Sequence, residues 1–230
     1  MKTRPVFPSA SLPALLLLGG LLLSLNGCNN VGIPGRAAPS AAKEIGYGEQ
    51  KGRGYTNAYF GMSAEMPEGW YIQDKEQNQE LLELGGEALA GDDANMKRML
   101  KATELQTVPL FATFEHPPGA PVPVNNSVIS VAERVGGLPG INSGQDYLYH
   151  AKQLLLQASV GYKEVDQGTT TIGGRSFDTL TMHLDNGGST IIQDYYSAIV
   201  RDYALCFVTT YVDDEGKAKC QQVLETVAFD

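Results

Sequence analysis

Histidines are the first residues to consider for chemistry, because imidazole serves both as a general base and as a zinc ligand. The sequence has three, and they stand far apart as His116, His150 and His183. None of them stands beside a second ligand at the spacing of known zinc motifs. The sequence therefore predicts no metal site.

Motifs for a nucleophile, a phosphate group or calcium are incomplete. Residues 140–144 carry a serine one place too late for a Gly-x-Ser-x-Gly elbow, and Ser143 is better interpreted as a helix cap. The glycine-rich residues 136–140 lack the Lys-Ser/Thr pair of a P-loop. The acidic residues 92–93 and 213–215 lack the alternating oxygen ligands of an EF-hand. We therefore expect no catalytic residue, no cofactor and no enzyme activity.

Two cysteines stand in the last third of the chain. On a predicted strand over residues 203–212, Cys206 shares a face with Ala204 and Val208. On the predicted final helix, Cys220 lies on the apolar stripe, so both thiols can face one strand–helix interface. One interpretation is a disulfide that closes a short loop and adds about 3 kcal/mol of stability. The other is a pair of buried thiols that act as small hydrophobes.

The N-terminus has the pattern of an export signal. Lys2 and Arg4 precede an apolar run of about 14 residues over positions 12–25. A membrane-spanning helix needs about 20 apolar residues, and Pro13 also argues against one. We therefore predict that residues 1–27 are a signal peptide.

The last four residues of this region, 25–28, read Leu-Asn-Gly-Cys and resemble the bacterial lipobox. This resemblance implies that the Cys28 thiol is lipidated, that the signal is cut before it and that the new amine is acylated. Several acyl chains on one residue hold a protein firmly to a membrane. Asn29, in place of aspartate, favours the outer membrane where the cell has one. The alternative is a conventional signal with a chance Gly-Cys pair.

The mature chain is acidic. After removal of residues 1–27 it has 15 basic and 26 acidic side chains, a formal charge of −11. This negative charge disfavours nucleic acid as a partner, and it disfavours binding to anionic lipid through a cluster of basic residues. Residues 28–53, rich in Gly, Ala, Pro and Ser, are predicted to be a flexible tether. We expect one globular domain over residues 54–230.

Hydrophobic periodicity predicts a domain of the α+β class. Short strands are expected over 59–62 and 70–72, two helices within 75–105, and strands over 108–115 and 127–135. A helix capped by Ser143 is expected to be followed by a strand at 170–172, an antiparallel meander over 177–212 and a last helix. Asn186-Gly187 is the strongest hairpin signal. Runs of hairpins with helices indicate an antiparallel sheet covered by helices.

Residues 59–62, an aromatic-Gly segment, and 66–70, Met-Pro-Glu-Gly-Trp, resemble the opening of PsbP-like and Mog1-like domains. The segment around Gly173-Gly174 and the end of the chain at 227–229 are similar as well. This resemblance covers about residues 55–230. It implies an antiparallel sheet sandwiched by helices, and no functional site of the family is matched residue by residue.

The first functional hypothesis is a membrane-tethered, non-catalytic lipoprotein that binds or assembles other envelope proteins. The second is a small-ligand carrier or sensor with a cavity between sheet and helices. A third, a hydrolase whose site is assembled from distant residues, has no motif in its support. Tyr195 and Tyr196, which alternate on one strand, are expected to face opposite sides of the sheet, with one of them available to solvent.

The lipid anchor gives a direct prediction. If Cys28 is the sole means of membrane attachment, a Cys28→Ala variant will move from the membrane to the soluble fraction on sedimentation of lysed cells. A variant that still sediments with membranes contradicts this, provided that its mass shows the signal has been cleaved.

Overall fold

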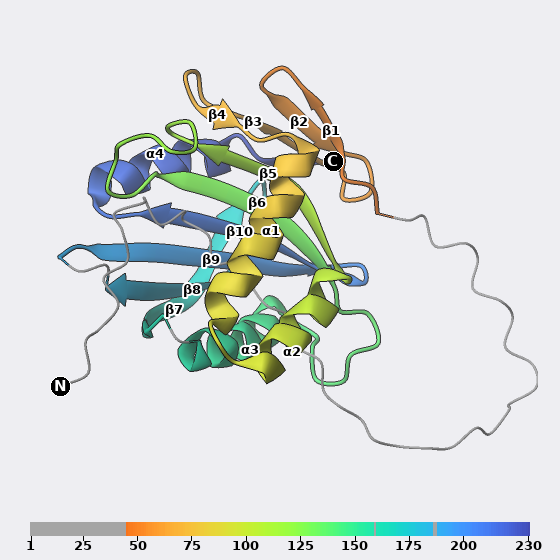
Figure 1. Cartoon of the computed structure of the whole chain (residues 1–230). Coiled ribbons are helices and arrows are strands. Elements are labelled where there is room, and N and C mark those ends of the chain that lie inside the picture. Colours follow the sequence, from red (N-terminus) through yellow and green to blue (C-terminus); the bar gives the residue numbers. More distant parts are fainter. Residues whose placement is uncertain (1–44, 159, 186–187) are drawn as a thin grey trace, which may run out of the picture.

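The computed structural model describes residues 45–158, 160–185 and 188–230. Within them the chain forms eleven strands and four helices (Figure 1). The strands are β1 Glu49–Lys51, β2 Gly54–Asn57, β3 Met62–Glu65, β4 Tyr71–Ile72, β5 Thr107–Phe114, β6 Ser127–Arg134, β7 Tyr162–Ile172, β8 Arg175–Asp185, β9 Thr190–Val200, β10 Tyr203–Tyr211 and β11 Ala228–Phe229. The helices are α1 Lys75–Ala90, α2 Ala94–Glu104, α3 Gly144–Gln157 and α4 Asp214–Glu225.

Seven strands form one antiparallel sheet in the order β4-β5-β6-β10-β9-β8-β7. The other four form a small antiparallel sheet in the order β1-β2-β3-β11. The small sheet joins the beginning of the domain to its end, because Ala228 of β11 pairs with Ser63 of β3. Thr226 strengthens this contact by bonding both the backbone N–H and the carbonyl of Glu65 at 2.9 Å. The α+β class expected from the sequence is confirmed.

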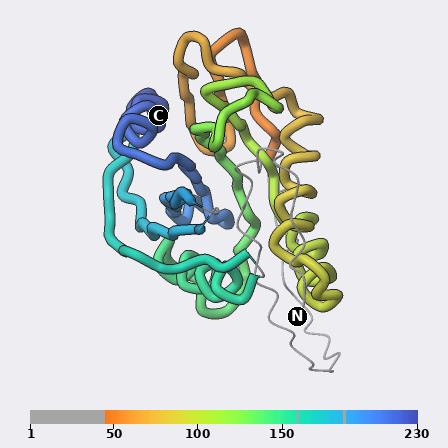
Figure 2. Tube along the Cα trace, turned by 60° about the vertical axis from the view of Figure 1, so that its left-hand side comes forward, coloured from red at the N-terminus to blue at the C-terminus, as the bar shows by residue number. Residues whose placement is uncertain are grey.

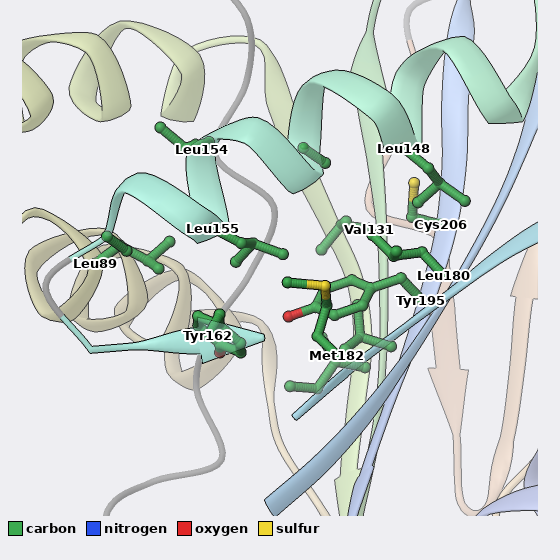
Figure 3. Packing of buried hydrophobic residues seen from close by; sticks show 14 of the residues in the cluster. Leu89, Val131, Leu148, Leu154, Leu155, Tyr162, Leu180, Met182, Tyr195 and Cys206 are labelled. Carbon is green, nitrogen blue, oxygen red and sulfur yellow. The ribbon is translucent and has the colours of Figure 1, made fainter. Parts of the chain in front are cut away.

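Helices and the small sheet cover the two faces of the large sheet. Helices α1, α2 and α3 pack on one face, whereas α4 and the small sheet pack on the other (Figure 2). Each face has its own apolar cluster. In the cluster under α3, Leu148 and Leu155 of the helix point toward the sheet, which contributes Val131, Leu180 and Met182 (Figure 3). The large sheet is therefore the middle layer of a three-layer domain.

The helices begin where side chains cap their free N–H groups. Ser143 accepts from Asp146 N–H at 3.1 Å, and the Asp146 carboxylate accepts from Ser143 N–H in return. Asp213 caps α4 by accepting from Gly216 N–H at 2.8 Å. The Ser143 cap was expected from the sequence. The two helices expected within residues 75–105 are α1 and α2, and α1 ends at Gly91, which adopts a φ of 52°.

The predicted boundary of the tether at residue 53 is wrong. Residues 49–51, expected within the flexible segment 28–53, form β1 and pair with β2. Ile45 packs against the apolar cluster of the small sheet. The β1–β2 hairpin turns at Gly52, whose φ of 58° suits glycine. Glycine is common both in flexible segments and in tight turns, so the glycine content of this region did not distinguish the two. Ordered packing therefore extends to Ile45, nine residues before the predicted start of the domain at residue 54.

The predicted strand over residues 59–62 is also misplaced. The Asn57 side chain accepts from the N–H groups of Tyr59 and Phe60 and holds residues 58–61 in a turn between β2 and β3. Tyr59 and Phe60 are instead part of an aromatic group with Tyr203. Aromatic content alone therefore did not distinguish a strand from a well-packed turn.

Helix α3 rests directly on the sheet at Gly144. A Cβ at this position would collide with the backbone carbonyl of Ser197 on β9. A Cβ at Gly86, within α1, meets only the Leu100 side chain at 3.9 Å. The two glycines therefore have different roles, although both lie in helices.

A Gly144→Ala variant will lose about 2–3 kcal/mol of stability, because either α3 or β9 must shift. Gly86→Ala, the matched control, will gain about 0.5–1 kcal/mol, because alanine favours the helix and has room there. Urea unfolding followed by circular dichroism measures both changes. A Gly144→Ala variant as stable as the wild type would contradict the close packing of α3.

Candidate functional site

The three histidines, which were the first candidates for catalysis and metal binding, lie on different parts of the fold. His116 follows β5, His150 lies on α3 and His183 lies on β8. Within residues 45–158, 160–185 and 188–230, no group of three or more His, Cys, Asp or Glu side chains is placed to hold a metal ion. In the same ranges no helix is long and apolar enough to cross a membrane. Cys28 and the predicted signal peptide lie outside the described residues.

Of the two interpretations of Cys206 and Cys220, the structure has the pair of buried thiols and not the disulfide. Both are free, buried thiols on opposite faces of the large sheet, Cys206 in the cluster under α3 and Cys220 in the cluster under α4. Alternation was read correctly for each residue, but α4 packs on the face that carries Leu205 and Phe207. Burial raises the pKa of each thiol to about 12, whereas a reactive cysteine has a lowered pKa.

A buried carboxyl group lies beneath α3. Glu133 on β6 is 3% exposed, and its Oε2 accepts from the Tyr147 hydroxyl of α3 at 2.6 Å. Burial raises the pKa of Glu133 to about 7, and the hydrogen bond from Tyr147 offsets part of this rise. Cys206 lies in the same cluster and donates to Ser197 at 3.5 Å. This group joins α3 to the sheet, because it satisfies polar atoms of both within the core.

Two more buried polar networks join the strands. On the α3 side, the hydroxyls of Tyr162 and Tyr195 both donate to Gln193 Oε1 at 2.7 Å. On the opposite face, Asp194 accepts from Thr181 at 2.6 Å and from Tyr211 at 2.7 Å. The polar atoms named here find their partners inside the protein, as buried polar groups must.

Tyr195 and Tyr196 lie on opposite faces of the sheet, as expected from strand alternation. The expected exposure of one of them is wrong, because both are buried. Each face of β9 is covered, by α3 on one side and by the layer that contains α4 and the small sheet on the other. The sequence showed the alternation but not the second covering layer.

The edge strand β7 differs from the rest of the large sheet. It is eleven residues long, its first and last residues are buried, and all nine residues from 163 to 171 are exposed. It pairs with β8, and it is the last strand in the order of the sheet. A bulge at Val165 interrupts the register. Only residues 170–172 were expected as strand, so most of this element was not expected from the sequence.

Apolar side chains on α3 lie near this edge. Tyr149 and Leu156 lie two helical turns apart and are 56% and 44% exposed, and Val165 of β7 is 52% exposed. Lys152, between Tyr149 and Leu156 on the helix, pairs with Glu164 of β7 at 3.0 Å. Helix α3 and strand β7 therefore form one surface with exposed apolar side chains.

A groove of about 610 Å³ lies between α1, α2 and the start of β5. Its floor contains buried side chains, including Leu82, Leu100 and Thr107. Its walls are charged. A volume of 300–1,000 Å³ is typical of small-molecule sites. This groove and the β7 edge are two surface features to which a partner or a ligand can bind.

No protein-family model and no curated protein matches the sequence. Among solved structures, the chain is similar to LpqN of Mycobacterium tuberculosis, a protein involved in cell envelope biogenesis. The identity is 12%, the TM-score is 0.45, and 73% of this chain and 82% of that chain are covered. It is also similar to the cyanobacterial PsbP of Synechocystis sp. PCC 6803. Here the identity is 13%, the TM-score 0.46 and the coverage 90% and 99%.

The second structure is a PsbP, the family whose opening motif the sequence resembles. The α+β architecture itself is established by the strands and helices described above. Similarity at this level carries over neither a function nor a site residue. The predicted lipidation concerns residues that the structure does not describe, so it stays a prediction.

The buried carboxyl of Glu133 predicts a pH-dependent stability. Its pKa rises from 4.5 to about 7 on folding, so between these values the folded state holds a proton that the unfolded chain has released. The stabilising effect is complete below pH 4.5 and is lost as the pH rises through 7. The expected loss is about 3 kcal/mol in total.

A Glu133→Gln variant keeps an acceptor for Tyr147 but cannot titrate. Its free energy of unfolding in urea will therefore fall less between pH 4.5 and 8 than that of the wild type. Glu225→Gln, at an exposed position of α4, is the control and will follow the wild type. Parallel pH profiles for wild type and Glu133→Gln would show that Glu133 is not the titrating group.

Proposed function

We propose that this protein is a lipid-anchored, non-catalytic module of the bacterial cell envelope that binds another envelope protein by strand addition at β7. The observation that carries the proposal is the row of nine exposed residues on an eleven-residue edge strand. An edge strand presents unpaired N–H and C=O groups, to which an extended segment of another protein can bond.

The two halves of β7 differ in how open they are to a partner. Residues 163–166 contain two acidic and one basic side chain and the bulge at Val165, which are features that protect an edge from pairing. Residues 167–171, Gln-Gly-Thr-Thr-Thr, have no charge and no bulge, and threonine favours strands. The second half is therefore the part to which a partner strand binds.

The neighbouring surface of α3 extends this binding site. Tyr149 and Leu156 supply exposed apolar area on α3, the helix that packs beside β7. Tyrosine is enriched at protein interfaces because its ring is apolar and its hydroxyl is polar. Backbone hydrogen bonds supply affinity in this binding mode, and such side-chain contacts supply specificity.

The lipid anchor places this surface near the membrane. Residues 29–44 separate Cys28 from the first described residue and can span at most about 55 Å when extended. The charge of −11 on the mature chain opposes contact with anionic lipid, which favours a domain that stands off the bilayer. A neighbouring envelope protein is then within reach of β7.

Photo-crosslinking in cells tests the proposal. A photo-reactive residue at Thr169 of β7 will give a discrete adduct with one envelope protein, whereas the same residue at Gln221, exposed on α4, will not. The double variant Thr169→Lys/Thr171→Lys, with the photo-reactive residue at Gln167, will reduce the adduct about tenfold, because lysine on an edge strand opposes pairing.

Gln221→Lys/Gln222→Lys adds the same charge on α4 and is the matched control, which will leave the adduct unchanged. Circular dichroism of each purified variant confirms that it folds. An equal yield of adducts from β7 and α4, or an adduct that the β7 lysines leave undiminished, would exclude β7 as the binding surface.

A further inference from the structure

The groove between α1 and α2 has walls of opposite charge. Glu83 and Glu87 line it from α1, and Lys97 and Lys101 line it from α2. Each pair is separated by four residues, which places both members on one side of their helix. One wall therefore attracts cations and the other attracts anions.

These walls do not neutralise each other. Among the described residues, no ion pair within 4.0 Å joins α1 to α2. Lys101 pairs with Glu104 of its own helix at 3.3 Å, and Arg98 donates to Ala94 and Asn95 one turn earlier on α2. The groove thus keeps complementary charges apart, where a molecule between them can contact both.

The floor of the groove suits an organic molecule. Leu82 and Leu100 provide apolar surface, and Thr103 and Thr107 are also buried there. Gly86 leaves space on the α1 side, since a Cβ there would still lie 3.9 Å from Leu100. Small-molecule sites combine such an apolar lining with a few polar groups that fix orientation.

We propose that this groove binds a small zwitterion whose ammonium group contacts Glu83 and Glu87 and whose carboxylate contacts Lys97 and Lys101. Packed helices lie about 8–10 Å apart, and an extended chain of three residues spans about 10 Å. A tripeptide has the length to place its two charged ends at opposite walls. This site is independent of the proposed strand addition at β7, because it lies on other elements of the fold.

The test is an NMR titration of the full domain with triglycine as the probe. Backbone amide signals of Gly86, Thr103 and Thr107 will shift and saturate. N-acetyl-triglycine, which lacks the ammonium group, and triglycine amide, which lacks the carboxylate, will each bind at least about fivefold more weakly, as expected for the loss of one partly exposed ionic contact.

Variants of the groove test which wall contacts the ammonium group of the ligand and which wall contacts its carboxylate. Glu83→Gln/Glu87→Gln will weaken triglycine binding and leave the affinity for triglycine amide no higher than that for N-acetyl-triglycine. Lys97→Gln/Lys101→Gln will give the reverse order. Glu49→Gln/Lys51→Gln, on β1, is the control that neutralises one acidic and one basic side chain away from the groove, and it will bind as the wild type does.

Two results would overturn the proposal. One is the absence of saturable shifts at these three amides with triglycine. The other is equal affinity for triglycine and its two capped forms, because a site that uses both walls must distinguish them.

Discussion

Strands β6 and β10 lie side by side near the middle of the large sheet and bury side chains on both of its faces. This double burial requires a covering layer on each side, and the helices and the small sheet provide them. On β10, Ala204, Cys206 and Val208 face α3, whereas Leu205 and Phe207 face the layer that contains α4. Successive side chains of this one central strand thus contribute to the apolar clusters on both faces of the sheet.

Because both faces are covered, polar groups on the central strands must find their hydrogen-bond partners inside the protein. Glu133, Gln193 and Asp194 are each at most 5% exposed, and each accepts hydrogen bonds from tyrosine hydroxyls inside the protein. A buried polar group without a partner costs free energy, so these networks also fix how helices and strands are placed. The surfaces proposed here for binding lie away from these networks, at β7 and between α1 and α2.

The sequence predicted well those elements that have apolar side chains on a regular period. The strands near 108–115 and 127–135 and the helix capped by Ser143 were expected close to their observed positions. Most of β7 was missed because nine of its residues are exposed and show no alternation of apolar and polar side chains. The sequence left open whether Cys206 and Cys220 are bridged, for another reason. Local periodicity gives the face of a strand but not the face on which a distant helix packs.

The candidate surfaces depend on this long-range information. The exposed second half of β7 has no signal beyond a run of threonines, and the groove needs two helices to be placed side by side. The charged residues of the groove were present in the sequence as ordinary solvated helix positions. Only their arrangement across α1 and α2 makes them complementary.

The pairing of β3 with β11 has a consequence for how the chain reaches its native state. Strand β3, near the start of the described domain, completes its sheet with residues 228–229, which lie far along the chain from it. Closure of this contact must await the C-terminal residues, and contacts so distant in sequence slow folding. We therefore expect the small sheet to close later than local pairs of the large sheet, such as β8 with β9.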